Sequence, residues 1–290
     1  MKKLSVLITG GGGFLGSNLA KQLLNLSYRV TVFDKKIKNK LVGVKYIVGS
    51  IEDEKLVNKS MKNIDYVYHY AGIAGIADCN NSPKKAVNIN ILGTLNILEA
   101  AKKYKIKKII FASSIYTLSE QGGVYRSTKQ ASEMLIENYY KLYNLEYIIL
   151  RFGSLYGPNS NDFNFISNVI KQAKKINKIY RNGDGSEIRK YIFIDDAARA
   201  SIQVMKKQYR NEYYEITGDQ FISIKRLLNK IKAKLNDDPK IIYENNKNDD
   251  EHYYKNPNTF KLRKSKKLIF NNKIDIDTGL DIIIKNEYEI

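Results

Sequence analysis

Tyr125 and Lys129 have side chains whose types and spacing suit chemistry on a hydroxyl group. They lie four residues apart in Tyr125-Arg126-Ser127-Thr128-Lys129, so a helix places the phenol and the ammonium on one face. A phenol is a poor base at neutral pH, but a neighbouring cation favours the phenolate and lowers its pKa. Because tyrosines and lysines are abundant here, the spacing alone also fits an ordinary helix surface.

Ser114 stands just before this helix, in Phe111-Ala112-Ser113-Ser114, at the end of an apolar run. In an α/β sheet the carboxyl end of a strand faces the ligand crevice. Ser114 can hydrogen-bond a substrate hydroxyl there. The predicted catalytic residues are therefore Ser114, Tyr125 and Lys129, with Ser114 and Tyr125 also contacting the substrate.

A glycine-rich turn near the amino terminus predicts a cofactor site. Thr9-Gly10-Gly11-Gly12-Gly13-Phe14-Leu15-Gly16 lies between a short apolar run and a helical pattern. Gly10 suits a tight turn, Gly13 lets the backbone approach a pyrophosphate, and Gly16 lets helix and strand pack closely. The free N–H groups of the helix start, at Phe14 and Leu15, attract the anion.

Asp34 indicates which dinucleotide the turn binds. It ends the second apolar run, where its carboxylate can accept hydrogen bonds from the ribose hydroxyls of adenosine. This favours NAD over NADP, whose 2′-phosphate the carboxylate would repel, although Lys35 and Lys36 lie beside it. The alternative is a flexible glycine turn with a surface aspartate.

Apolar runs that alternate with helical patterns position these residues. Such alternation predicts a parallel sheet with right-handed crossovers, an α/β fold of the Rossmann type that is doubly wound. The expected strands are Leu4–Ile8, Arg29–Phe33, Val44–Val48, Tyr66–Tyr70, Ile109–Ala112, Leu145–Arg151 and Lys190–Ile194. The expected helices are Phe14–Leu26, Ala86–Lys103, Gln130–Tyr143, Phe165–Lys175 and Asp195–Met205.

The turn residues Tyr156-Gly157-Pro158 interrupt this alternation and predict a boundary near residue 155. Residues 1–155 would form the NAD-binding domain, to which about 188–208 return. Residues 156–290 would form mainly a smaller α/β domain that binds the substrate.

The chain has 290 residues, of which 43% are hydrophobic and 27% charged, so the composition is that of a globular protein. One cysteine and two histidines make a thiolate or imidazole metal cluster unattainable, and no metal is expected. The first apolar run is too short for a signal peptide or a membrane span. We therefore expect a cytoplasmic protein that does not bind membranes.

The net charge of +19 arises from 49 basic and 30 acidic residues spread along the chain, with local groups such as Lys102–Lys108. Abundant lysine, asparagine, isoleucine and tyrosine are typical of biased codon usage, which favours solvated helix faces over a nucleic-acid surface. The same charge also attracts an anionic small molecule such as a nucleotide diphosphate.

Further ordered motifs show that the chain resembles a known family over essentially its whole length. It is similar to extended short-chain dehydrogenases/reductases of the NAD-dependent epimerase/dehydratase group, which act on nucleotide-activated sugars. Besides Thr9–Gly16 and Tyr125–Lys129, the matching stretches are Asp65–Gly72, Asn90–Thr94, Ser113-Ser114, Leu150-Arg151, Leu155–Pro158, and Gly183–Gly185 with Arg189 and Asp195.

The resemblance implies a role for each matching residue. Tyr125 would be the base, Lys129 would also hold the nicotinamide ribose, and Ser114 would orient the reacting hydroxyl. Substrate contacts would come from Arg189, on the diphosphate, and from Ser154. Further cofactor contacts would come from Ser50, Ile51, Tyr70, Ala71 and Gly72, while Asn90 would brace the sheet. Taken alone, His69 and Asn90 also fit satisfied core polar groups, and Arg189 fits a surface charge.

Departures from the family pattern narrow the activity. Dehydratases of the family carry a Thr-Asp-Glu run where this chain has Ser114-Ile115-Tyr116, so a 4,6-dehydratase is disfavoured. Only ten residues separate Ser114 from Tyr125, which predicts a roof that is open or built by other segments. Ser154 stands where relatives often have an asparagine, so the contacts of this position with the substrate phosphate or sugar are in doubt.

The function expected from the resemblance is an NAD-dependent epimerase of a nucleotide-activated sugar, acting at C4 through a transient ketone. A sugar-nucleotide 4-dehydrogenase or a keto-sugar reductase uses the same residues and remains an alternative. A catalytically silent NAD-binding sensor or RNA-associated protein is an alternative of a different class. The helices 86–103 and 130–143 resemble those through which family members form homodimers, and no nucleic-acid partner is expected.

Overall fold

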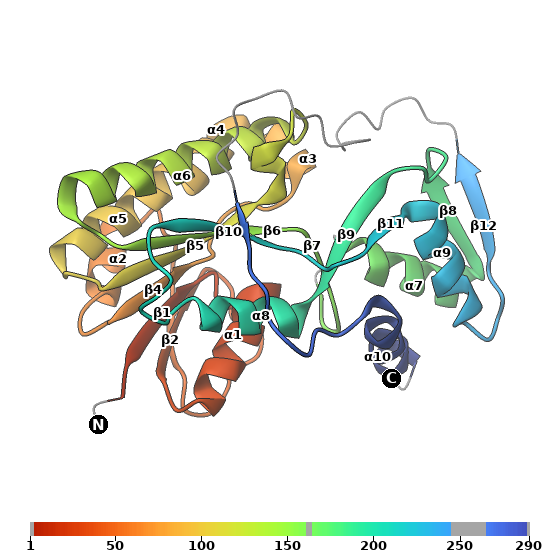
Figure 1. Cartoon of the computed structure of the whole chain (residues 1–290), viewed down its shortest axis with the longest axis horizontal. Coiled ribbons are helices and arrows are strands. Elements are labelled where there is room, and N and C mark those ends of the chain that lie inside the picture. Colours follow the sequence, from red (N-terminus) through yellow and green to blue (C-terminus); the bar gives the residue numbers. More distant parts are fainter. Residues whose placement is uncertain (1–2, 161–163, 245–264, 289–290) are drawn as a thin grey trace.

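The computed structural model describes residues 3–160, 164–244 and 265–288. Within these ranges, eight strands form one sheet in which every neighbouring pair is parallel (Figure 1). Their order across the sheet is β3 (Lys45–Val48), β2 (Arg29–Asp34), β1 (Ser5–Thr9), β4 (Tyr66–His69), β5 (Lys108–Ser114), β6 (Tyr147–Phe152), β10 (Glu212–Ile216) and β13 (Lys266–Lys267). The order reverses at β1, as in a doubly wound Rossmann fold, which confirms the predicted fold class.

Helices cover both faces of this sheet (Figure 1). One face carries α2 (Glu54–Ser60), α5 (Gly93–Lys103) and α6 (Gly123–Tyr143), with the shorter α3 (Ile76–Asn81) and α4 (Pro83–Ala86) beside the start of α6. The other face carries α1 (Phe14–Asn25) and α8 (Ile194–Gln203). The strands β1 and β6 are buried along their whole length, as parallel strands between two helical layers must be.

The predicted helix 86–103 is interrupted in the structure. Its first residue, Ala86, ends α4, and Val87–Leu92 form a π-helical segment, η1, before α5 begins. Such π-helical segments are rare and occur often at functional sites. The interruption could not be inferred from the apolar periodicity, which continues through it.

A smaller α/β part lies beside the carboxyl edge of the large sheet, at the right of Figure 1. It contains a three-stranded sheet of β11 (Phe221–Ser223), β9 (Ile188–Phe193) and β7 (Ser154–Tyr156), and a two-stranded sheet of β12 (Lys240–Glu244) and β8 (Lys178–Asn182). The helices α7 (Phe165–Ile176), α9 (Ile224–Ala233) and α10 (Ile276–Tyr288) enclose its separate core.

The segment that returns to the large sheet differs from the predicted one, residues 188–208. Residues 188–193 form β9, which pairs with β7 and β11 and not with the large sheet. The return begins with α8, which packs against α1, and continues to β10, which pairs with β6. The short strand β13 adds a second return. The division into two domains near residue 155 stays a prediction.

Candidate active site

The backbone of the glycine turn packs so closely that side chains would not fit at Gly10 and Gly16, as in the turns that bind dinucleotides. Gly10 has a positive φ of 72°, and a Cβ there would lie 2.5 Å from the backbone nitrogen of Ala71. A Cβ at Gly16 would lie 2.3 Å from the carbonyl oxygen of Gly10. Helix α1 begins after Gly13, and no side chain caps its first turn. The N–H groups from Phe14 onward are thus presented to an anion.

Asp34 lies next to this turn at the end of β2. One carboxylate oxygen accepts a hydrogen bond from the N–H of Gly12 at 2.9 Å, and the other accepts one from the N–H of Lys36 at 3.1 Å. A carboxylate has about four acceptor positions, so two remain for ribose hydroxyls. The turn and the carboxylate therefore fit the adenosine end of NAD.

The residues after β3 lie at the same edge of the sheet. Ser50 donates its hydroxyl to Glu52 at 2.8 Å, and the buried Ile51 lies against Gly93, where a Cβ would approach it within 2.6 Å. The Ser50 hydroxyl therefore has a partner within the chain, and Ile51 offers a cofactor its backbone and part of an apolar wall.

Tyr70 differs from what the resemblance implies for its side chain. Its ring packs edge-on against Tyr68 and Phe152, within the core cluster beside α1 and α8. Only its backbone approaches the glycine turn, since a Cβ at Gly10 would lie 2.8 Å from its carbonyl oxygen. Any contact of Tyr70 with the cofactor would therefore be made by the main chain.

His69 forms a fully satisfied hydrogen-bond chain behind the turn. Its Nδ1 is 2.8 Å from the Thr9 hydroxyl, which accepts from the N–H of Ala71, and its Nε2 is 2.9 Å from the Thr94 hydroxyl. Because Thr94 donates its proton to the carbonyl of Asn90, Nε2 must be the protonated nitrogen. Burial, with a contribution from Lys129, lowers the pKa of His69 to about 3. His69 is thus a neutral structural group.

Asn90, within η1, ties the loop after β4 to the helix that carries the catalytic candidates. Its Oδ1 accepts from the N–H of Ile73 at 2.8 Å, and its Nδ2 donates to the carbonyl of Ile73 and to the hydroxyl of Thr128. Its own carbonyl accepts from Ser132 on α6. Gly72 lies against this amide, since a Cβ there would be 2.9 Å from Oδ1.

Tyr125 and Ser114 are brought together, as the sequence predicts. Their hydroxyl groups are hydrogen-bonded, and both side chains are buried. Burial nevertheless raises the pKa of Tyr125 to about 12, against the hydrogen bond from Ser114, which lowers it. The expected lowering of the pKa by Lys129 is not realised in the chain alone. An additional positive charge is needed before the phenol can act as a base near neutral pH.

Lys129 lies between the ends of β4 and β5. Its Nζ donates to the carbonyl of Ala112 at 2.8 Å, lies 4.7 Å from the centre of the Phe111 ring, and would be 3.7 Å from a Cβ at Gly72. Burial lowers its pKa to about 8, while Cys79 and Glu133 act in the opposite direction. One donor is used by Ala112, which leaves two donors for a ligand near Gly72.

The roof over Tyr125 is built by segments outside the short Ser114–Tyr125 connection as well as by that connection. The Tyr116 ring, in the 3-10 helix η2 (Ile115–Leu118), meets the Tyr125 ring edge-on at 6.4 Å. Cys79, from α3, packs against Tyr125, and Asn80 accepts from the N–H of Val124 at the start of α6. Tyr125 is consequently only 9% exposed.

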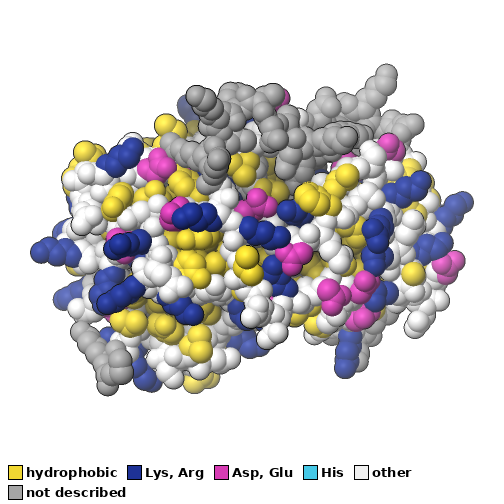
Figure 2. All heavy atoms as spheres, in the orientation of Figure 1, with side chains coloured by type: hydrophobic (Ala, Val, Ile, Leu, Met, Phe, Trp, Pro, Cys, Tyr) yellow, Lys and Arg dark blue, Asp and Glu magenta, His cyan; other side chains and the backbone are white. Residues whose placement is uncertain are grey.

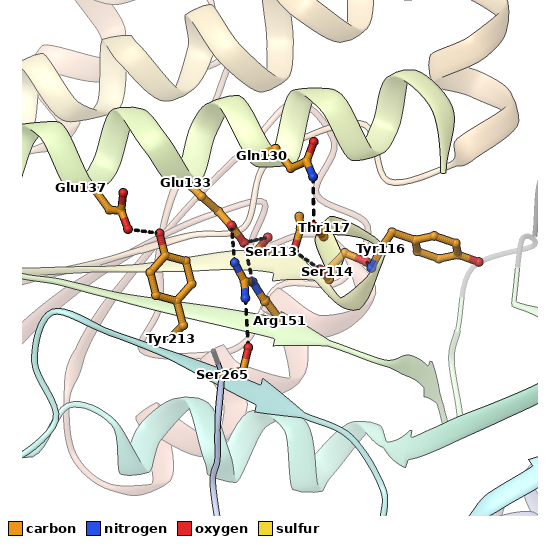
Figure 3. A network of polar contacts seen from close by, with 10 residues as sticks. All are labelled: Ser113, Ser114, Tyr116, Thr117, Gln130, Glu133, Glu137, Arg151, Tyr213 and Ser265. Carbon is orange, nitrogen blue, oxygen red and sulfur yellow. Dashed lines mark hydrogen bonds and ion pairs between the residues drawn. The ribbon is translucent and has the colours of Figure 1, made fainter. Parts of the chain in front are cut away.

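A buried ion pair, Glu133–Arg151, holds α6 against the strands and was missed by sequence reasoning (Figure 3). The guanidinium makes bonds of 2.9 and 2.7 Å to the two carboxylate oxygens, and Ser113 donates to Glu133 at 2.6 Å. Arg151 also donates to Ser265 and lies over the Tyr213 ring. The signal was present, because a charge inside the apolar run Tyr147–Phe152 requires a partner.

The two substrate candidates outside the large sheet lie in the three-stranded sheet. Ser154, on β7, pairs in register with Tyr191, two residues beyond Arg189 on β9. Arg189 is half-buried and pairs in register with Ile222 of β11. Both residues thus belong to the smaller part, whereas Tyr125, Ser114 and Lys129 belong to the large sheet and its helix.

The described residues form neither a cluster of metal ligands nor a helix that could span a membrane. No group of three or more histidine, cysteine, aspartate or glutamate side chains within 3–160, 164–244 and 265–288 is placed to hold a metal ion. In the same ranges, no helix combines the length and the apolar character that crossing a bilayer requires.

Comparisons with known proteins agree with this fold. A model of the NAD dependent epimerase/dehydratase family matches residues 6–217. A putative UDP-glucose 4-epimerase of Methanocaldococcus jannaschii is 30% identical over 261 residues, which cover 82% of this chain and 85% of the relative. A UDP-N-acetyl-alpha-D-glucosaminuronate decarboxylase of Bacillus cytotoxicus is 30% identical over 271 residues, 84% of each chain.

A crystal structure of the UDP-glucose 4-epimerase of Thermotoga maritima with UDP-glucose superposes with a TM-score of 0.85, at 25% identity and over 99% of both chains. Fold and site together define an enzyme that binds a dinucleotide at the carboxyl edge of a Rossmann-type sheet. The chain belongs to the NAD dependent epimerase/dehydratase family, and its cofactor is accordingly NAD.

Proposed function

We propose that this protein is an epimerase that inverts C4 of a nucleotide-activated sugar. The observation that carries the proposal is the buried group of Tyr125, Ser114 and Lys129 beside the glycine turn. The named relatives support a UDP-sugar as the class of substrate. When bound, NAD supplies the chemistry of accepting a hydride from a sugar carbon and returning it.

The residues of the chain would move and hold the proton. Ser114 orients the sugar hydroxyl toward the phenol of Tyr125, to which it is already hydrogen-bonded. Tyr125, as phenolate, removes the proton of the sugar hydroxyl. It later returns a proton to that oxygen, when C4 has the opposite configuration. Lys129 contributes its charge and a donor beside Gly72, while Arg189 and Ser154 hold the diphosphate end so that the ketone can turn without leaving.

Elimination of water is a less suitable reaction for this site. A 4,6-dehydratase needs a carboxyl acid and base near the sugar, and Ile115 and Tyr116 occupy those positions here. Glu133, the carboxylate nearest along the helix face from Lys129, is engaged in its buried ion pair with Arg151.

The experiment is turnover of Tyr125→Phe against wild type, with NAD content measured by absorbance. Loss of the phenolic hydroxyl should lower the rate of UDP-glucose inversion by about 1,000-fold or more, while NAD stays bound. Retained full activity would remove Tyr125 from the mechanism. Net accumulation of NADH by wild type would assign a 4-dehydrogenase or reductase, and NAD binding without any turnover would assign a sensor.

We also propose a homodimer formed through η1, α5 and α6. Several large apolar side chains on these helices are exposed, among them Leu92 at 49%, Met134 at 52% and Leu142 at 70%. Met134→Glu with Leu142→Glu should convert a dimer into a monomer in sedimentation analysis, whereas Leu26→Glu, on the opposite face of the sheet, should not. A wild-type monomer would refute the interface. Location in the cytoplasm stays a prediction.

A further inference from the structure

A hollow of about 550 Å³ lies at the amino edge of the large sheet, opposite the candidate active site. Its wall includes Tyr66, which begins β4, Lys108, which begins β5, and Glu146, which precedes β6. The ends of α5 and α6 and the segment after α8 complete it. This edge is at the left of Figure 1, and Figure 2 shows several Lys and Arg side chains at that end.

The charge of this hollow is strongly unbalanced. Its only lining carboxylate among the described residues is Glu146. The six lining cations are Lys102, Lys105, Lys107, Lys108, Lys207 and Arg210. Lys102 and Lys107 are paired with Glu99 and Asp65. A net excess of positive charge therefore remains.

Three of the cations, Lys105, Lys207 and Arg210, are exposed, and their side chains have no ion pair or hydrogen bond among the described residues. Cations at helix ends often serve only to compensate the carbonyl groups there. At this edge, backbone N–H groups already bind several of those carbonyls. Backbone N–H groups from Tyr104 to Ile106 close the end of α5, and the N–H of Asn144 closes α6.

Lys108 closes the third helix end. Its buried Nζ donates to the carbonyls of Val204, Lys206 and Tyr209, which follow α8. Burial lowers the pKa of Lys108, Glu146 raises it, and the positive charge of Arg210 lowers it further. Arg210 thus lies close enough to Lys108 to disfavour its charge, and a bound anion would relieve that repulsion.

We propose that this hollow, the basic pocket, binds the phosphate chain of a nucleoside triphosphate or of an inorganic polyphosphate. Lys105, Lys207 and Arg210 supply donors and charge for the phosphates. A hollow of this volume matches one small ligand, whereas an extended nucleic-acid strand requires a groove. Tyr143, which is 49% exposed with Lys102 4.5 Å from its ring centre, offers a surface on which a base can stack.

Calorimetric titration of the NAD-loaded protein with sodium tripolyphosphate tests the proposal. Saturable binding at one site is expected, and Lys105→Gln with Lys207→Gln and Arg210→Gln should weaken it by about tenfold or more. The matched control removes three exposed lysines of the α2 region, as Lys55→Gln, Lys59→Gln and Lys62→Gln, and should bind as wild type does. Equal weakening in both triple variants, or no binding by wild type, would overturn the proposal.

Titration with ATP and UTP separates the two sources of phosphate. Tighter binding than tripolyphosphate, with the difference lost in Tyr143→Ala, identifies a nucleotide, and equal binding identifies the phosphate chain alone. Binding of a short RNA through the same three cations without binding of tripolyphosphate would overturn the small-ligand assignment. Since every readout is binding, failure of the proposed epimerase activity leaves this test intact.

Discussion

The two edges of the large sheet each contain a buried lysine, and the two lysines have opposite surroundings. Lys129, at the carboxyl edge, has one hydrogen-bond partner among the described residues, the carbonyl of Ala112. Lys108, at the amino edge, donates to three carbonyls after α8. Burial lowers the pKa of both ammonium groups. An ammonium has three donors, so Lys108 has none left, whereas Lys129 can still bind a ligand.

This difference shows how a buried lysine can be interpreted. Burial and a lowered pKa alone do not distinguish a functional lysine from a structural one, because both groups share them. The number of donors already used does distinguish them. At the carboxyl edge, the Glu133–Arg151 pair holds the helix that presents Lys129, while Lys129 itself remains available.

The largest effect is expected from Lys129→Met. Turnover should fall by about 1,000-fold because the site loses the ammonium whose remaining donors lie beside Gly72 and are available to a ligand. Stability should rise, because an apolar side chain of similar length replaces an ammonium that burial disfavours. Turnover assays and denaturant unfolding check the two parts, and a variant that is active or less stable would contradict the functional interpretation of Lys129.

The pH dependence of that stability difference provides its control. Between pH about 8 and 10.5, unfolded chains keep the Lys129 proton that folded chains have released. The unfolded state then binds more protons, so the stability of wild type rises with pH relative to Lys129→Met. Below pH 8 the unfolding free energy of Lys129→Met should exceed that of wild type by about 3 kcal/mol, and this difference should vanish near pH 10.5.

Glu133→Gln should have the next largest effect. It removes the carboxylate charge that the buried guanidinium of Arg151 contacts at 2.7 Å, and breaking a buried pair in this way costs about 3–5 kcal/mol of unfolding free energy. Glu137→Gln, one turn further along α6, makes the same chemical change opposite the neutral phenol of Tyr213 and should cost about 1 kcal/mol. Chemical denaturation of both variants checks this. If both lost the same unfolding free energy, the ion pair would stabilise the fold no more than the hydrogen bond to Tyr213 does.

Lys108→Met should have the smallest effect on turnover, and it should act on stability instead. Turnover should stay at the wild-type rate, since the amino edge does not contact the candidate active site. Stability should fall by about 2 kcal/mol because three carbonyls lose their donor. Thermal unfolding and turnover of the same preparation check it, and a loss of activity without a loss of stability would reverse the comparison.

Much of the fold could be predicted because it depends on local patterns. Alternating apolar runs and helical periodicity placed β1, α1 and β2 within one residue of their observed ends. The glycine turn and Asp34 were predicted together because their spacing follows from one strand–turn–helix–strand unit. The return of β10 and β13 could not be predicted, because the pairing of distant strands depends on the whole sheet and not on the sequence nearby.

The amino-acid sequence by itself determined the chemistry available at the site: a phenol and an ammonium one helical turn apart, a serine at the end of a strand, and a glycine turn followed by a carboxylate. Only the tertiary structure decided the state of these groups. Burial by α3 and η2 raises the pKa of Tyr125 to about 12, and the partners of Lys129 and Lys108 give two similar side chains different roles. The physical reason is that a pKa and a free donor depend on surrounding atoms from distant segments, which only folding brings together.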